Sequence, residues 1–261
     1  MHRFILLTFF LVTAVMSYAD DCHPEVKDKA YIVGYGSLLD EDSLRSTIGD
    51  VPPFASALAK VKGFTRHFNL FYEVFGLKSA ALLATPKENS VINALLFELD
   101  SASIYKLDER EKGYCRRPVS KNNVVFYNEI DAFNDKDVAY IYLLKDKLPI
   151  VVGKLTDQAN DSQSIEEVTQ QPTAIDPSEY MVSQVYIDLF LGGCIKLEQK
   201  FKTENFAKDC VLTTEGWTEM SVVNDRLVPR RPWQYQPLAM KIDGLLASFA
   251  PGMIEKRKLE S

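Results

Sequence analysis

The sequence is poor in the residues that usually build metal sites. Its 261 residues include three histidines and four cysteines, and no two cysteines stand in a C-x-x-C arrangement. Only His23 and His67 lie beyond the first few residues. Zinc is usually held by closely spaced pairs of cysteine or histidine ligands. A zinc site of that spacing is therefore not expected in this chain.

Three further functional classes are not indicated. The formal net charge is −6, so a broad basic surface for binding nucleic acid is not expected. The chain contains no Walker A pattern for nucleotide phosphates. The turn that reads GYGSLL does not match G-x-S-x-G, so a nucleophilic role for Ser37 is not supported.

Long apolar runs are missing except at the N-terminus. There a short positive start precedes the apolar run Phe4–Met16, and Ser17 and Ala19 are small residues at the −3 and −1 positions of a cleavage site. The run is too short to span a bilayer comfortably. We therefore predict a signal peptide at residues 1–19, an exported mature chain, periplasmic or secreted, and no membrane contact after cleavage. An uncleaved N-terminal anchor is the alternative.

Export changes the meaning of the four cysteines. Cys22, Cys115, Cys194 and Cys210 form an even set, and an oxidising compartment permits two disulfides. Four cysteines allow three pairings, between which the sequence does not choose. Cys194 and Cys210 are the closest pair along the chain and are favoured for that reason.

The apolar patterns predict an α+β chain in which strands outnumber helices. Expected strands cover residues 30–33, 64–74, 80–85, 91–99, 119–127 and 138–144, with a turn at 86–90. Helices are expected from Asp40 to Gly49, from Asp100 to Gly113, and from Asp176 to the Gly192-Gly193 pair, in each case with a capping residue at the start and glycine at the end. The expected architecture is a mixed sheet curled into a small barrel with a few flanking helices.

The domain organisation is expected to be simple. After the signal peptide, a single domain covers residues 20–261. A polar stretch without aromatic residues at about 153–175 reads as an insertion, and a C-terminal extension begins after about residue 200. In that extension, Asn224–Arg226 and Pro229–Pro232 either line a cleft or brace the domain.

The first candidate site is the stretch AYIVGYGSLLDE at residues 30–41. A strand, a glycine-containing turn and a helix follow one another, so free backbone N–H groups of the turn favour a carboxylate. Gly34 and Gly36 allow a ligand to approach the backbone closely. The alternative is that the segment is only a tight turn.

The second candidate site is the stretch LDEREKGYCRRPV at residues 107–119. Asp108 and Glu111 are three residues apart and share a helix face. Glu111 lies in the last helical turn, where the negative end of the helix raises the pKa of a carboxyl group toward that of a useful general base. The alternative is a solvated helix end in which Glu111 pairs with Lys112, Arg116 or Arg117.

These segments together resemble the γ-glutamylcyclotransferase superfamily, which includes AIG2-like and ChaC-type proteins. The family has a Tyr-Gly-Ser-Leu-type loop, a Leu-Asp-x-x-Glu helix followed by tyrosine, and a Pro-Ser-x-x-Tyr helix start. Here these marks are Tyr35–Leu38, Leu107–Glu111 with Tyr114, and Pro177–Tyr180. Segments 63–66 and 92–97 stand where the family places its next strands. The resemblance covers about residues 30–194, and 110–114 is most similar to the ChaC-type branch.

The resemblance implies a small mixed barrel that cyclises a γ-glutamyl group to 5-oxoproline without metal or cofactor. It implies that Glu111 is the catalytic base. The substrate-binding residues would be Tyr35, Gly36, Ser37, Leu38 and Tyr180, with the loop holding the glutamyl carboxylate or polarising the reacting carbonyl. The expected partner is a small γ-glutamyl compound, and no nucleic acid.

Two other functions remain open on the sequence alone. One is a non-catalytic protein on the same scaffold that binds a carboxylate or a peptide end in the Tyr35–Leu38 pocket. The other is a thiol hydrolase or amidase that uses Cys115 or Cys22 as its nucleophile. Neither the leaving group of a cyclisation nor the oligomeric state is indicated by the sequence.

Overall fold

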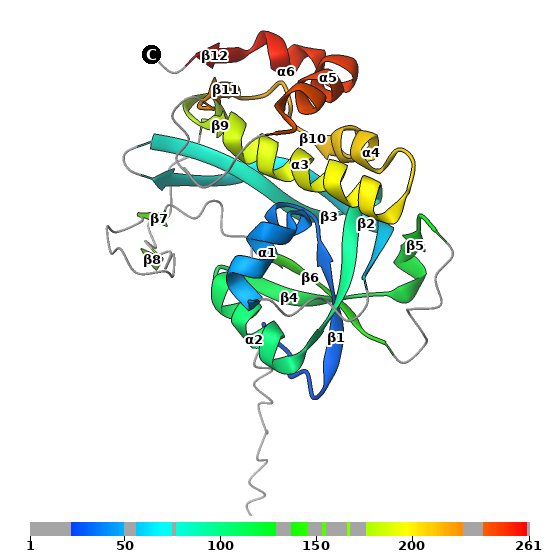
Figure 1. Ribbon diagram of the computed structural model, residues 1–261. Helices are drawn as coiled ribbons and strands as arrows, with labels where there is room; N and C mark the ends of the chain where they lie inside the picture. Colours follow the sequence, from blue (N-terminus) through cyan, green and yellow to red (C-terminus); the bar gives the residue numbers. More distant parts are fainter. Residues whose placement is uncertain are drawn as a thin grey trace, which may run out of the picture.

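A long antiparallel ribbon forms the centre of the computed structural model (Figure 1). The structure describes residues 22–49, 56–74, 77–128, 137–145, 153–154, 166–167, 176–226 and 237–259, so the signal-peptide prediction for residues 1–19 lies outside the described part of the chain. The strands are β1 Lys29–Gly34, β2 Ser56–Val74, β3 Leu77–Asp100, β4 Tyr114–Val119, β5 Val124–Phe126, β6 Ala139–Leu144, β7 Gly153–Lys154, β8 Glu166–Glu167, β9 Met181–Ser183, β10 Thr214–Glu215, β11 Ser221–Asn224 and β12 Arg257–Leu259. The α-helices are α1 Glu41–Ile48, α2 Ser101–Arg110, α3 Gln184–Phe201, α4 Phe206–Leu212, α5 Ala239–Phe249 and α6 Pro251–Glu255, and short 3₁₀ helices are η1 Ser37–Leu39, η2 Lys121–Asn123 and η3 Pro177–Glu179.

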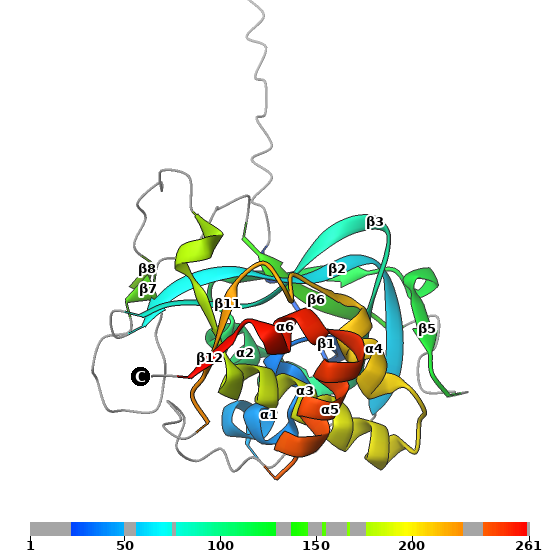
Figure 2. The ribbon, with the colours of Figure 1, turned by 90° about the horizontal axis from the view of Figure 1, so that it is seen from above.

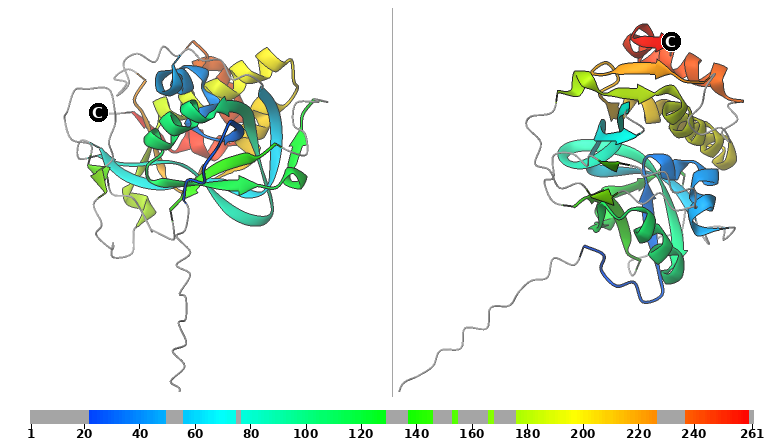
Figure 3. Two further views of the ribbon diagram at one scale, coloured as in Figure 1. Left: turned by 90° about the horizontal axis from the view of Figure 1, so that it is seen from below. Right: turned by 90° about the vertical axis from the view of Figure 1, so that its left-hand side faces the viewer.

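The strands form one mixed sheet. Its main path has the order β12-β11-β9-β3-β1-β6-β4, and β2 lies along β3 and also pairs with β5, β7 and β10. The pairs β2–β3, β1–β3 and β4–β6 are antiparallel, whereas β1–β6, β9–β11 and β11–β12 are parallel. The ribbon of β2 and β3 curls strongly, and α3 lies between the sheet and the C-terminal helices α5 and α6 (Figures 2 and 3). The predicted mixed sheet with flanking helices is therefore confirmed.

Strand β1 is buried on both faces. Successive side chains of a strand point to opposite sides, and Ala30 and Ile32 join the large core under the helices. Tyr31, Val33 and Tyr35 join a second core formed by side chains from five strands inside the curl of the sheet. The loop that follows β1 is therefore anchored at its first residue in a core enclosed by strands.

The predicted turn at residues 86–90 does not separate two strands. Residue Lys62 of β2 pairs with Val91, and Phe64 pairs with Pro86, so four residues of β3 lie opposite the single residue Gly63. Gly63 has φ of 87° and Asn89 has φ of 58°, both in the left-handed region. The turn-forming residues thus make a bulge within one long ribbon.

The predictions for the first two helices are largely confirmed. The Asp40 carboxylate caps α1 by accepting a hydrogen bond from Ser43 N at 2.9 Å, and Gly49 follows the helix with φ of 81°. The Asp100 carboxylate caps α2 in the same way, with Ser103 N as donor at 2.7 Å. Helix α2 ends earlier than predicted, at Arg110, so that Glu111 is its C-cap residue.

The prediction of a helix from Asp176 to Gly192-Gly193 is wrong at both ends. Asp176 caps only the 3₁₀ turn η3, and strand β9 follows. Helix α3 begins after Ser183, whose hydroxyl caps it, and continues through both glycines to Phe201. Pairing of Ser79 with Met181 keeps that segment extended. The glycines lie inside the helix and do not end it. At Gly193 the missing side chain permits close packing, as described below.

The prediction of a strand over residues 119–127 is also wrong in detail. Strand β4 lies earlier, at Tyr114–Val119, and pairs with β6. The turn η2 interrupts the predicted run, and only β5 continues it. The residues after α2 are drawn into the sheet by this long-range pairing, which the local pattern does not reveal.

The insertion and the C-terminal extension are both joined to the sheet. In the insertion, β7 pairs with β8 and with β2. In the extension, β10 pairs with β2 and β11 with β9. Arg226 binds the carboxylates of Asp188 and Asp243, so it braces α3 against α5, while Pro229–Pro232 lie outside the described residues. None of the described helices combines the length and apolar character needed to cross a membrane.

Candidate active site

The loop at Tyr35–Leu38 folds back tightly on the end of β1. The buried Tyr35 side chain donates a hydrogen bond to the carbonyl of Tyr142 in β6 at 2.9 Å. The backbone then closes the η1 turn, with Leu39 N bonding to the Gly36 carbonyl at 3.0 Å. A side chain at Gly34 would approach Leu38 to 3.1 Å. Glycine at position 34 therefore permits the fold-back that presents the loop.

The Glu111 side chain is largely buried at the end of α2. It is 15% exposed, and its Oε1 lies 3.2 Å from Arg110 Nε. Burial raises the pKa of the Glu111 carboxyl above its ordinary value of 4.5, and the Arg110 charge opposes part of that rise. The raised pKa makes Glu111 a stronger base, as the sequence predicted, although burial and not the helix end is the main physical cause.

The alternative of a solvated helix end is wrong for Glu111. Lys112 pairs with the exposed Glu109, and Arg116 contacts Asp108. Within the described part of the chain, Glu111 has Arg110 as its ion-pair partner and neither Lys112 nor Arg116. Its carboxylate is consequently held inside the protein and not in a surface charge cluster.

Arg110 joins Glu111 to the loop. Its Nη2 donates to the Ser37 hydroxyl at 2.9 Å, while Nη1 donates to the Ser43 carbonyl and to Thr47 Oγ1, each at 2.9 Å. The same guanidinium lies beside Glu111. The structure thus brings together Ser37 and Glu111, which are far apart in the sequence, and ties both to α1. This arginine bridge was not among the residues predicted from sequence.

The phenol groups of Tyr35 and Tyr114 lie near enough to the Glu111 carboxylate to be affected by its charge. The Glu111 charge adds to burial in raising the pKa of Tyr35 and of Tyr114 well above the ordinary value of a phenol, so both stay protonated at neutral pH. Tyr186 and Tyr72 act on Tyr114 in the same sense. Tyr35 directly follows β1, and the other three come from β4, α3 and β2. Tyr35 and Tyr114 are therefore polar but uncharged neighbours of Glu111.

Tyr186, which was not predicted as a site residue, lies beside the Tyr35–Leu38 loop. Its hydroxyl accepts a hydrogen bond from Leu82 N at 3.0 Å and lies 3.7 Å from where a side chain on Gly36 would begin. The sequence places Tyr186 in a helix but has no signal for its direction. Its position depends on α3 beginning at Gln184.

Tyr180 itself is buried against Phe71. The two ring centroids are 4.7 Å apart, and Lys78 Nζ lies 5.8 Å from the Tyr180 ring. Leu38 is likewise buried and belongs to the large core under the helices, as does Tyr180. Substrate contact by these two side chains stays a prediction from the resemblance.

Asp108 has a structural environment beside the site. It accepts a hydrogen bond from the Tyr142 hydroxyl at 2.6 Å and lies 3.2 Å from His23 Nδ1. Arg116 Nη1 is 3.5 Å away. Because Tyr142 also binds Tyr35 through its carbonyl, this cluster fastens the N-terminal segment to the strands that carry the site.

All four cysteines are paired. The disulfides are Cys22–Cys115 and Cys194–Cys210, the second being the pair that sequence proximity favoured. No free cysteine remains. The hypothesis of a thiol nucleophile at Cys115 or Cys22 is therefore wrong for this state of the protein. Across the described ranges, no group of three or more histidine, cysteine or acidic side chains is placed to hold a metal ion.

Two adjacent glycines of α3 provide a test of how the loop is supported. A side chain at Gly193 would lie 2.6 Å from the Leu39 carbonyl oxygen and 2.9 Å from Asp40 N, whereas one at Gly192 would meet only Ile242 at 4.0 Å. Overpacking against backbone costs about 1–3 kcal/mol, while alanine in place of a helical glycine gains about 0.8–1.0 kcal/mol. We expect Gly193→Ala to destabilise the protein and Gly192→Ala to stabilise it, as measured by urea unfolding.

The matched pair of variants separates packing from helix propensity. Gly193→Ala should also reduce catalysis, because the Leu39–Asp40 backbone directly follows the loop. Equal unfolding midpoints for the two variants would contradict the close contact between α3 and η1.

The comparisons with known proteins come from solved structures. A glutathione-specific γ-glutamyl cyclotransferase from yeast is 12% identical, with 71% of this chain and 95% of that chain covered and a TM-score of 0.36. A protein described as gamma-glutamyl cyclotransferase is 12% identical, with 45% and 67% covered and a TM-score of 0.34. A protein from Arabidopsis thaliana is 20% identical, with 47% and 73% covered and a TM-score of 0.34.

No protein-family model matches the sequence, and no curated protein matches it. The structural neighbours include cyclotransferases of the kind that the sequence resembles. At these identities and TM-scores, the likenesses carry no information about activity.

Proposed function

We propose that the protein is a γ-glutamylcyclotransferase that converts a γ-glutamyl compound to 5-oxoproline and releases the amine. The observation that carries this proposal is the bridge of Arg110 between the buried Glu111 carboxylate and Ser37 of the loop. A base of raised pKa and a turn of backbone N–H groups are joined by one guanidinium. This arrangement suits a reaction that needs a proton acceptor and a holder for a carboxylate or carbonyl.

The chemistry begins at the α-amine of the substrate. Its pKa is about 7.7–8.0, so much of it is protonated near neutral pH and is not nucleophilic. Glu111 accepts a proton from the ammonium group. The freed amine then attacks the γ-carbonyl carbon of the same glutamyl residue of the substrate. A bond forms between that nitrogen and the carbon of the γ-carbonyl group, which is Cδ of the glutamyl residue, and this closes a five-membered lactam. The C–N bond to the leaving amine breaks as Glu111 returns its proton to the leaving nitrogen. The attacking nitrogen gives up a second proton on ring closure, which Glu111, ionised again, accepts and passes to the released amine. The products are the lactam and an ammonium ion, and no water is consumed.

Positioning supplies much of the catalysis in this scheme. An intramolecular attack held in reactive geometry gains up to about 7–11 kcal/mol over a bimolecular one. The Tyr35–Leu38 loop would hold the glutamyl carboxylate or polarise the reacting carbonyl through its backbone N–H groups. The neutral phenols of Tyr35 and Tyr114 enclose the reacting groups without competing with Glu111 for protons.

The test is an assay of 5-oxoproline release by the purified protein. The substrates are glutathione, a set of γ-glutamyl dipeptides and γ-glutamyl-ε-lysine. We expect 5-oxoproline and the free amine in equal amounts from at least one of them, and the preferred substrate identifies the leaving group. Saturable binding of these compounds without turnover would instead favour the non-catalytic carboxylate-binding protein.

We propose that the reaction takes place outside the cytoplasm. The apolar N-terminal run of the sequence supports export, and the two disulfides support an oxidising compartment. Fractionation of the source cells tests this directly, since a mature chain that begins near Asp20 is expected in the exported fraction.

A further inference from the structure

Arg66 is a charged residue buried beside the large core. Its side chain comes from strand β2 and is 0% exposed. No carboxylate within the described residues pairs with it, since all its hydrogen bonds go to carbonyl, amide and hydroxyl oxygens. The ring of Phe190 lies 4.6 Å from its guanidinium carbon. A lone buried cation is costly, so a specific purpose is expected for it.

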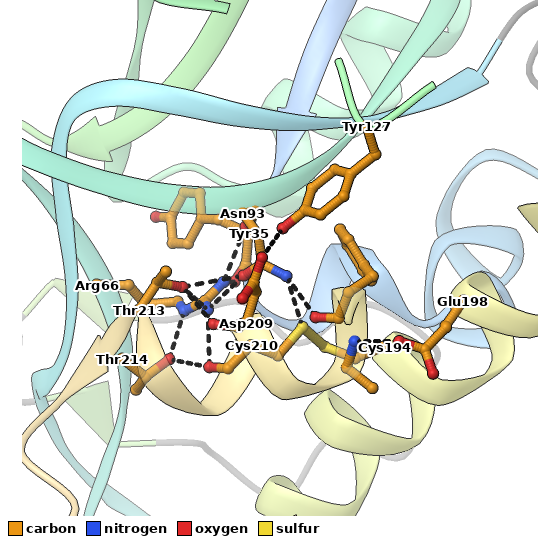
Figure 4. The surroundings of a disulfide bond; sticks show 12 residues. Tyr35, Arg66, Asn93, Tyr127, Cys194, Glu198, Asp209, Cys210, Thr213 and Thr214 are labelled. Carbon is orange, nitrogen blue, oxygen red and sulfur yellow. Dashed lines mark hydrogen bonds between the residues drawn. A yellow bond between two sulfur atoms is a disulfide. The ribbon is translucent and has the colours of Figure 1, made fainter. Parts of the chain in front are cut away.

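The guanidinium is fully occupied by acceptors from three parts of the chain. Its acceptors are the Tyr35 carbonyl at 2.8 Å, Asn93 Oδ1 at 2.8 Å and the Asn93 carbonyl at 3.1 Å, Thr214 Oγ1 at 2.8 Å, and the Cys210 carbonyl and Thr213 Oγ1 at 3.0 Å (Figure 4). It has no donor left for a substrate. Arg66 can therefore influence the candidate site only through the groups to which it donates hydrogen bonds.

One of those groups belongs to the candidate site. The Tyr35 carbonyl is part of the same peptide unit as the Gly36 N–H, and in a trans peptide the two point in opposite directions. A hydrogen bond from Arg66 to the carbonyl therefore aims the Gly36 N–H away from the Arg66 cluster. Within the described part of the chain, that N–H has no backbone acceptor.

The bond also changes the strength of the donor. Hydrogen bonds from a charged group are stronger than neutral ones, and they polarise the next group along a chain of hydrogen bonds. Burial lowers the pKa of Arg66 to about 9, which leaves it charged at neutral pH. The Tyr35–Gly36 peptide unit is therefore polarised by a full positive charge, which makes its N–H a better donor to an anion.

The Cys194–Cys210 disulfide contacts the group of residues that bind Arg66. Asn93 Nδ2 donates to Cys210 Sγ at 2.9 Å and to the Phe206 carbonyl at 3.0 Å, and Thr214 Oγ1 donates to the Cys210 carbonyl at 2.7 Å. Cys210 is bonded to Cys194 of α3. Figure 4 shows these side chains converging on the guanidinium between β2 and α4. The C-terminal extension thus supplies the rigid wall against which Arg66 is oriented.

We propose that Arg66 is a positioning residue that orients and polarises the Tyr35–Gly36 peptide unit so that the Gly36 N–H is the donor presented to the substrate. The proposal rests on the proposed cyclotransferase function for its catalytic consequence. It also makes a structural prediction that is independent of turnover, because the state of the Gly36 amide can be measured directly.

The experiment combines nuclear magnetic resonance with kinetics. Gly36 is the only glycine in the chain that follows a tyrosine, so labelling tyrosine carbonyls with carbon-13 and glycine amides with nitrogen-15 selects its signal alone. Arg66→Lys is compared with the wild type and with Arg226→Lys, which alters a partly buried arginine that binds Asp188 and Asp243 away from the loop. We expect the Gly36 nitrogen signal to move upfield in Arg66→Lys only.

Thr214→Val is a second, milder variant for the case in which Arg66→Lys does not fold. It keeps the arginine but removes the acceptor of its Nε. A smaller shift of the Gly36 signal in the same direction is expected.

The kinetic arm gives kcat and KM separately for the same proteins. Misplacement of a catalytic group by about 1 Å costs up to about 10²-fold, so we expect kcat/KM of Arg66→Lys to fall by about that factor while Arg226→Lys retains its activity. An unchanged Gly36 signal, or unchanged kcat/KM in folded Arg66→Lys, overturns the proposal. If the wild type makes no 5-oxoproline, the proposed function fails, and the amide signal alone then decides whether Arg66 positions the loop.

Discussion

Replacement of Glu111 by glutamine is expected to abolish 5-oxoproline release and to leave the fold intact. Glutamine keeps the shape of the side chain but cannot accept the proton of the substrate amine. General acid–base catalysis contributes typically about 10²–10⁴-fold to a rate, so turnover should fall at least by that range. The matched control is Glu109→Gln, one residue before the arginine bridge, because Glu109 is 74% exposed and pairs with Lys112 on the surface.

The Glu111→Gln variant should be more stable than the wild type at neutral pH. Burial raises the folded-state pKa of Glu111 above 4.5, so the unfolded chain loses this proton at a lower pH than the folded chain does. The folded state then binds more protons than the unfolded state, and the stability of the wild type falls as pH rises through that window. Glutamine does not titrate and avoids this loss.

Urea unfolding at pH 4 and at pH 7 measures this effect. The free energy of unfolding of Glu111→Gln, measured relative to that of the wild type, should increase from pH 4 to pH 7. For Glu109→Gln the difference from the wild type should stay the same. A loss of activity accompanied by a loss of stability at pH 7 would mean that Glu111 is a structural residue and not a tuned base.

Removal of the Cys22–Cys115 disulfide is expected to produce the largest loss of stability. The bond joins residues 93 positions apart, and the segment that it closes contains both the Tyr35–Leu38 loop and Glu111. In the chain-entropy account, a closed loop of about 100 residues is worth about 4.7 kcal/mol and one of about 15 residues about 3 kcal/mol. The Cys194–Cys210 bond, with a separation of 16, is therefore the natural comparison.

The first disulfide also fastens the beginning of the described chain to the site. The Cys22 carbonyl accepts a hydrogen bond from Arg116 N at 2.8 Å, and the neighbouring His23 lies beside Asp108. Cys115 follows Tyr114, which lies near Glu111. Loss of the bond frees one end of this assembly, so we expect lower activity as well as lower stability.

The measurement is urea unfolding of Cys22→Ser/Cys115→Ser and of Cys194→Ser/Cys210→Ser under the same conditions. The first double variant should lose about 4–5 kcal/mol and the second about 3 kcal/mol. Wild-type unfolding behaviour of the first double variant would contradict the assignment of this bond as a main constraint on the fold.

Some parts of the fold and site are predictable because their causes are local. The caps of α1 and α2 depend on Asp40 and Asp100, whose carboxylates bind N–H groups three residues on. The position of Glu111 at the end of α2 also follows from a short stretch of sequence, whereas the burial that raises its pKa does not. Residues of this kind can be predicted from a short stretch of sequence.

Other parts depend on contacts between distant segments. Gly193 looks like a helix stop, but its missing side chain admits the Leu39 backbone. Arg66 looks like a surface residue in a strand, yet its acceptors lie between 27 and 148 positions away along the sequence. Tyr186 enters the site only because α3 begins later than its best local start. Such features have no local signal, since the partner that gives them meaning is far along the chain.

The central claim is that the substrate's own amine, and not water, attacks the γ-carbonyl. The direct measurement is turnover of the preferred γ-glutamyl substrate in water enriched in oxygen-18, followed by mass spectrometry of the acid product. A matched substrate with an acetylated α-amine serves as the control, because its nitrogen cannot attack. We expect 5-oxoproline without oxygen-18 and no reaction of the acetylated compound. Glutamate carrying oxygen-18, or release of amine from the acetylated substrate, would show that the protein is a hydrolase and contradict the account.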